Sequence, residues 1–146
     1  MIRFFLLTVF FLIGVVARGQ AVLDWFDLSE GISWGQSSPK TIFPGFQKAN
    51  FSPKMQALEG KKVVITGYLL VLGGNQSIYL LSKNPMASCF FCGNGGPETV
   101  VDLKFAQRPS FVMDELLSVE GTLFLNRNNP NGCYYRIENA DALSLN

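Results

Sequence analysis

The chain has 146 residues, of which 48% are hydrophobic, and its twelve basic and eleven acidic residues give a net charge of +1. This length suits one domain with a real core and excludes two. The near-neutral charge excludes the basic stripe of a nucleic-acid-binding protein. The absence of histidine leaves thiol, thioether and carboxylate groups as the available chemistry.

Residues 1–19 predict a cleaved signal peptide. Arg3 supplies the positive charge, residues 4–16 form an apolar run, and small residues precede a cleavage point after Gly19. The run is about 13 residues, against the roughly 20 that a spanning helix needs, and an uncleaved anchor is the alternative. We expect an exported protein, periplasmic or extracellular, with no membrane span after cleavage. Loss of Arg3 and Arg18 changes its net charge to −1, since all eleven acidic residues stay.

Residues 20–50 predict an N-terminal arm that precedes a main domain at residues 51–146. The arm and its junction are rich in aromatic side chains with glycine and proline between them: Trp25, Phe26, Trp34, Phe43, Phe46 and Phe51. We expect this arm to pack across the main domain, and a partner-binding surface is the alternative.

The main domain reads as mainly β. A short helix is expected first, with Ser52 as N-cap, Pro53 in the first turn and Gly60 as the stop. Five strands are then expected at residues 63–72, 77–82, 99–105, 119–126 and 133–139, with one or two helical turns at 109–116. The first two strands form a hairpin, and Gly67 inside the first indicates a bend or bulge. In the fifth strand, Cys133, Tyr135 and Ile137 share one face.

This element order predicts a five-stranded OB-like barrel with a short helix between strands 3 and 4. Another small β-barrel or sandwich is the competing fold.

A cysteine pair lies between the second and third strands, in the run Met86-Ala-Ser-Cys89-Phe-Phe-Cys92-Gly93-Asn-Gly-Gly-Pro97-Glu98. Glycine directly after the second cysteine lets the backbone fold back toward the sulfurs, as in metal-binding knuckles. This run is the most distinctive candidate site in the sequence.

The CFFCG…GPE run, continued by Thr-Val, resembles a family of small exported bacterial proteins of unknown function related to anticodon-binding-like OB domains. The resemblance covers about residues 51–143. It implies an exported OB-type barrel without an assigned activity, and some relatives encoded near transporter genes suggest metal handling with a transporter component as partner. In an OB connectivity, the loop before Cys133 lies at the same end of the barrel as Cys89 and Cys92, so all three sulfurs are expected to converge.

Three interpretations of the cysteines stay open. The first is a soft-metal site at Cys89 and Cys92, with Cys133, Met86 or Glu98 as further ligands, binding zinc or copper(I). The second is a structural disulfide, the usual state of exported cysteines, in a protein that serves as an envelope interaction module. The third is a redox-active CxxC, which the glycine-rich continuation disfavours because reactive thiols usually lie at a helix N-terminus.

We therefore expect a non-enzymatic metal-binding or accessory protein whose partner is a metal ion or another envelope protein. Neighbouring carboxylates such as Asp114 and Glu115 show no spacing typical of acid–base catalysis.

Overall fold

Five strands form a closed barrel in the computed structural model, which describes residues 19–35, 47–73, 77–89 and 93–146. The strands are β4 (Lys62–Leu72), β5 (Ile78–Ser82), β6 (Val100–Phe105), β7 (Leu116–Leu125) and β8 (Tyr135–Ser144). They pair in the order β4-β5-β6-β8-β7, and β7 returns to pair with β4. Only β6 and β8 are parallel within this ring. The predicted mainly-β, OB-like barrel is confirmed.

The ring closes because β4 changes partner along its length. Its residues up to Tyr68 pair with β7, and those from Tyr68 onward pair with β5. Gly67 lies at this change, where a Cβ atom would be only 2.7 Å from the carbonyl oxygen of Ser82 and 2.8 Å from the Trp25 ring. A side chain at position 67 would therefore push apart the strands that the bend brings together.

Alternate residues of the barrel strands fill its interior. In β6 the pattern is Val101 and Leu103 inward, with Asp102 and Lys104 outward, as the alternation in the sequence predicts. The remaining barrel strands, β4, β5, β7 and β8, also contribute apolar side chains to the interior: Val63, Ile65, Leu69, Leu81, Leu117, Val119, Leu123, Leu125, Tyr135 and Ile137.

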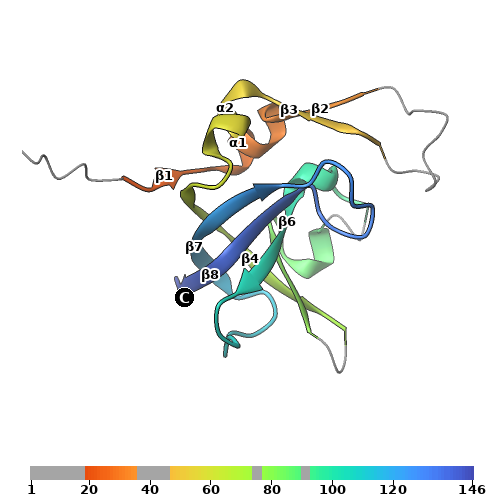
Figure 1. Ribbon diagram of the computed structural model, residues 1–146. Coiled ribbons are helices and arrows are strands. Elements are labelled where there is room, and N and C mark those ends of the chain that lie inside the picture. The colour runs from red at the N-terminus through yellow and green to blue at the C-terminus, as the bar shows by residue number, and fades with distance from the viewer. Residues whose placement is uncertain (1–18, 36–46, 74–76, 90–92) are drawn as a thin grey trace, which may run out of the picture.

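The N-terminal arm closes one end of the barrel. It contains β1 (Ala21–Val22), α1 (Trp25–Glu30) and β2 (Ile32–Trp34), and is followed by β3 (Ala49–Phe51) and α2 (Pro53–Leu58). Figure 1 shows both helices and the β2–β3 ribbon together above the barrel. Leu23, Leu28 and Met55 reach the interior cluster from this side. The arm thus packs against the barrel, as predicted, while Phe43 and Phe46 lie outside the described residues.

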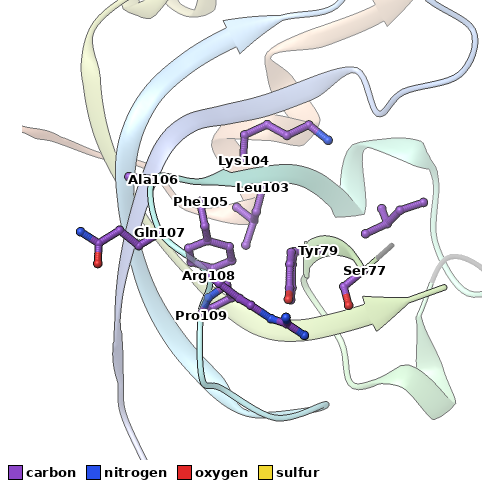
Figure 2. Close-up of a pocket in the computed structure, with 10 residues that line it drawn as sticks. Ser77, Tyr79, Leu103, Lys104, Phe105, Ala106, Gln107, Arg108 and Pro109 are labelled. Carbon is purple, nitrogen blue, oxygen red and sulfur yellow. The ribbon is translucent and has the colours of Figure 1, made fainter. Parts of the chain in front are cut away.

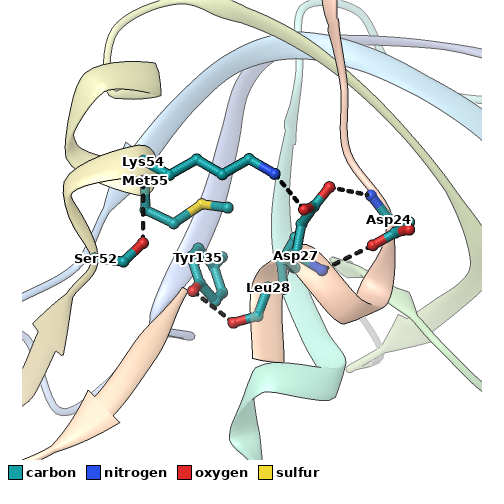
Figure 3. Close-up of polar contacts among 7 residues, drawn as sticks. All are labelled: Asp24, Asp27, Leu28, Ser52, Lys54, Met55 and Tyr135. Atoms are coloured by element: carbon teal, nitrogen blue, oxygen red, sulfur yellow. Dashed lines mark hydrogen bonds and ion pairs between the residues drawn. The ribbon is translucent and has the colours of Figure 1, made fainter. Parts of the chain in front are cut away.

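We call the elements from β1 to α2, which close this end of the barrel, the lid. Short polar contacts hold the lid in place (Figure 3). Asp24 caps α1 by accepting the N–H of Asp27 at 2.7 Å, and the Asp27 carboxylate pairs with Lys54 of α2. The buried Tyr135 hydroxyl donates to the Leu28 carbonyl at 2.7 Å and so ties β8 to α1. Helices α1 and α2 have six residues each, which is too short for a stable isolated helix. These tertiary contacts therefore stabilise both helices.

The N-terminus of α2 agrees with the sequence. Ser52 is the N-cap and accepts the N–H of Met55 at 3.3 Å, with Pro53 in the first turn. Gly60 follows the helix with φ +76, a conformation that glycine adopts without strain.

The predicted helix between strands 3 and 4 is wrong. Residues 109–116 form an extended segment with a turn, where Asp114 has φ 63. The backbone of this segment forms hydrogen bonds with β4. The Asp114 N–H donates to the Leu69 carbonyl at 2.8 Å, and the Leu69 N–H donates to the Glu115 carbonyl at 2.9 Å. Pairing with a strand replaces the hydrogen bonds that a helix would make internally.

The last two strands are displaced from their predicted bounds. The fourth begins at Leu116 rather than 119, and the fifth runs from Tyr135 to Ser144 rather than 133–139. Because Cys133 precedes the strand, its expected alternation with Tyr135 does not hold, and it packs against a different cluster. Among the described residues, no helix is long and apolar enough to cross a bilayer.

Candidate functional site

A second hydrophobic cluster lies on the outer face of the barrel, beneath the cysteine loop. Leu70 of β4, Leu80 of β5 and Cys89 are its buried members. Met86, Cys133 and Leu72 pack against them and are partly buried. We call Met86, Cys89 and Cys133 the sulfur cluster. Three of the five predicted metal ligands are thus brought together from two loops.

Two of these sulfurs are in direct contact. The Cys89 Sγ donates to the Met86 Sδ at 3.8 Å. Cys89 is fully buried and Cys133 is half-buried, and neither forms a disulfide in this structure.

The loop that carries Met86 and Cys89 is anchored at both ends. Its described residues include the short 3-10 helices η1 (Met86–Ser88) and η3 (Pro97–Thr99). The Met86 N–H donates to the Asp114 carboxylate at 2.7 Å, and the Lys83 N–H donates to the Thr99 carbonyl at 3.0 Å. Asp114 therefore fixes the backbone of Met86, the residue that carries the thioether. No motif in the sequence connects Asp114 to the cysteine loop.

Gly93 has φ +83, in the left-handed region that favours glycine. The chain folds back here, since the Asn94 N–H donates to the Cys89 carbonyl at 3.3 Å. Cys92 itself lies outside the described residues, together with Phe90 and Phe91.

The fifth predicted ligand, Glu98, is not in the sulfur cluster. It belongs to η3, which packs against α1 near the closed end of the barrel. Its negative charge adds to burial in raising the pKa of Tyr135, a residue of the interior cluster. Within the described ranges, no group of three or more histidine, cysteine, aspartate and glutamate side chains is arranged to hold a metal ion.

Burial dominates the electrostatics at Cys133. Removal from water, with a smaller contribution from the Asp102 carboxylate, raises the pKa of its thiol to about 12, while Lys104 opposes the shift. A thiol in this environment is protonated at neutral pH. It becomes a thiolate only if a cation replaces the proton.

The sequence does indicate that Leu70 and Leu80 are buried, although a simple alternation of inward and outward residues does not predict it. Both strands carry continuous apolar runs, residues 69–72 and 78–81, and a strand that is apolar on both faces is covered on both. The runs therefore indicate a cover over the outer face, which the cysteine loop provides.

A separate hollow of about 550 Å³ lies beside the start of β5 and the end of β6 (Figure 2). The Tyr79 and Phe105 rings meet edge to face on its wall, with centroids 5.4 Å apart, and Ser77 and Arg108 lie beside them. No predicted metal ligand lines this hollow. It is thus distinct from the sulfur cluster.

Comparisons with known proteins support the fold. No protein-family model matches the chain, and no curated protein matches its sequence. A solved structure of a DUF3299 family protein from Pseudomonas aeruginosa is similar, with a TM-score of 0.58 and 18% sequence identity over 88% of this chain and 97% of that one. At this identity the similarity shows a shared fold alone.

Proposed function

We propose that this chain is an exported, non-enzymatic soft-metal-binding protein that carries copper(I), or zinc, at the sulfur cluster. The observation that carries the proposal is the 3.8 Å contact between the Cys89 and Met86 sulfurs, with Cys133 packed against the same cluster. Another envelope protein, such as a transporter component, is the proposed recipient.

The spacing of the two sulfurs suits joint coordination. Metal–sulfur bonds of about 2.3 Å at a tetrahedral angle place two sulfurs about 3.8 Å apart. Cys89 and Met86 already have this separation, so a metal ion would need little rearrangement of either side chain.

The donor types favour copper(I) over zinc. One thioether and two thiols from the described residues form a soft donor set, which copper(I) accepts readily. Zinc is usually held by thiolate, imidazole and carboxylate ligands, and the carboxylate expected from Glu98 lies in η3 beside α1. Cys92, which follows Cys89 by three residues, remains a proposed further ligand.

The apolar surroundings support a metal-carrying role over a redox role. Leu70 and Leu80 shield the cluster from water, a property that stabilises soft-metal coordination. A reactive CxxC usually lies at a helix N-terminus, which lowers the thiol pKa, whereas residues 93–96 after Cys92 form turns and extended backbone.

Metal stoichiometry of the mature chain tests this proposal. The protein is purified reduced, loaded with copper(I) or zinc, and weighed intact under native and denaturing conditions. We expect one metal ion per chain, retained natively and lost on denaturation with three free thiols appearing. Protein that stays metal-free after loading would contradict the proposal, and so would one disulfide, seen as a mass about 2 Da below the reduced value, in protein isolated without reductant.

Two variants localise the site. Cys89→Ser is expected to abolish copper(I) binding, and Met86→Leu to weaken it about tenfold or more through loss of the soft thioether. Met113→Leu is the matched control, since Met113 is exposed, lies outside the sulfur cluster and only accepts the Val71 N–H through its sulfur. Equal affinity in the Met86 and Met113 variants would remove the thioether from the site.

A further inference from the structure

A polar groove of about 490 Å³ lies on the outer face of β6, β7 and β8. The loop at residues 126–132 forms its rim, and Cys133 is the point where it adjoins the sulfur cluster. The volume is within the range of small-ligand sites. The groove therefore has the size of a binding site.

The groove offers an aromatic platform. Phe124, near the end of β7, is 41% exposed although its side chain is large and apolar. The guanidinium carbon of Arg136 lies 4.2 Å from the centre of its ring. This stacking contact holds the ring in one orientation and leaves part of its surface open to a partner.

The rim is held rigid by one asparagine and presents two others. The Asn126 carboxamide oxygen accepts the N–H of Asn129 at 2.9 Å, and its nitrogen donates to the Cys133 carbonyl at 3.1 Å. The side-chain amides of Asn128 and Asn131 are exposed and make no hydrogen bond to the described protein. Each amide offers both a donor and an acceptor, as a ligand hydroxyl does.

The cations along the groove are compensated by carboxylates. Lys104 lies 3.1 Å from Asp102, Arg127 lies 2.8 Å from Glu59, and Arg136 lies 3.0 Å from Glu138. Such a surface lacks the excess positive charge that phosphate-rich ligands require.

We propose that this groove binds a neutral glycan. The apolar face of a sugar ring packs on Phe124, and its hydroxyls bond to the Asn128 and Asn131 amides. An aromatic platform, free amides and balanced charge favour a glycan over a nucleic acid. This proposal does not depend on metal binding at the sulfur cluster.

Titration of the mature protein with neutral tetrasaccharides tests the assignment. The probes are cellotetraose, chitotetraose and maltotetraose, followed by proton–nitrogen NMR shifts. We expect saturable shifts at Phe124, Asn128, Asn131 and Arg136 with at least one probe. Absence of saturable shifts with all three would overturn the proposal, and so would tighter, salt-dependent binding of an oligothymidylate.

Three variants complete the test. Phe124→Ala is expected to lower the affinity about tenfold, whereas Phe26→Ala, which removes an exposed ring from α1, leaves it unchanged. Asn131→Ala, at an exposed position, is expected to lower it about threefold. Unchanged affinity in both groove variants would overturn the assignment. Cys89→Ser should keep glycan binding, which separates this site from the metal site.

Discussion

Leu69 and Leu70 are neighbours in β4, and both are completely buried, yet they face different environments. Leu69 points into the barrel interior, where every barrel strand and the N-terminal lid contribute side chains. Leu70 points outward to the sulfur cluster, which residues of two loops cover. Two equally buried side chains are therefore held by different surroundings. Regular strands of the whole barrel enclose the interior, whereas segments without regular strands cover the outer cluster.

The sharpest test of this comparison is to truncate each leucine. Leu69→Ala is expected to lower the free energy of unfolding by about 4 kcal/mol, and Leu70→Ala by about 2 kcal/mol, because a loop relaxes around a cavity more readily than a closed barrel. Urea unfolding of the two variants measures both values. Equal losses would show that the loop packs as rigidly as the barrel.

A medium effect is expected where β8 meets the lid. Tyr135→Phe removes the hydroxyl that donates to the Leu28 carbonyl and leaves that carbonyl without its partner. The expected loss is about 1–2 kcal/mol in the free energy of unfolding. Tyr79→Phe is the control, because its hydroxyl makes no hydrogen bond to the described protein and its loss should change stability little. A similar loss in both variants would contradict the role of the lid contact.

The smallest effect concerns acid stability of the lid. A hydrogen bond from Lys54 holds the pKa of Asp27 below its ordinary value of 3.8, although burial opposes the shift. Because the folded pKa is the lower one, the pair stabilises the fold above pH 3.8, and this contribution is lost as pH falls through the lowered pKa. Exposure of Lys54 to solvent limits it to less than about 1 kcal/mol.

Lys54→Met should therefore narrow the stability difference between neutral and acid solution. Urea unfolding of both proteins at neutral pH and at the acid end measures this difference. If the difference between the two proteins were the same at both pH values, Lys54 would not be the partner that sets the pKa of Asp27.

Much of the barrel follows from local sequence patterns. Alternation at residues 101–105 predicted the inward face of β6, and Ser52 with Pro53 predicted the start of α2. These succeed because the cause lies within a few residues of the effect. The helix expected at 109–116 failed because its backbone hydrogen bonds go to Leu69, about 45 residues earlier in the chain, which no local pattern reveals.

The candidate site was predictable only through connectivity. The expected meeting of Cys89 and Cys133 depended on the OB arrangement of strands, and both contribute to the outer cluster. Alternation failed at Cys133 because β8 begins two residues later. The place of Glu98 beside α1 depends on how the lid packs against η3, a long-range contact that the sequence does not encode locally.

The parallel pairing of β6 with β8 has a consequence for how the protein is made. Strand β8 joins β6 and β7, so the ring stays open until residues through Ser144 have left the ribosome. During synthesis β4, β5 and β6 can pair only as an open sheet whose apolar face lacks its cover. We therefore expect the barrel to close only once β8 is available, with the apolar surface of the earlier strands exposed until then.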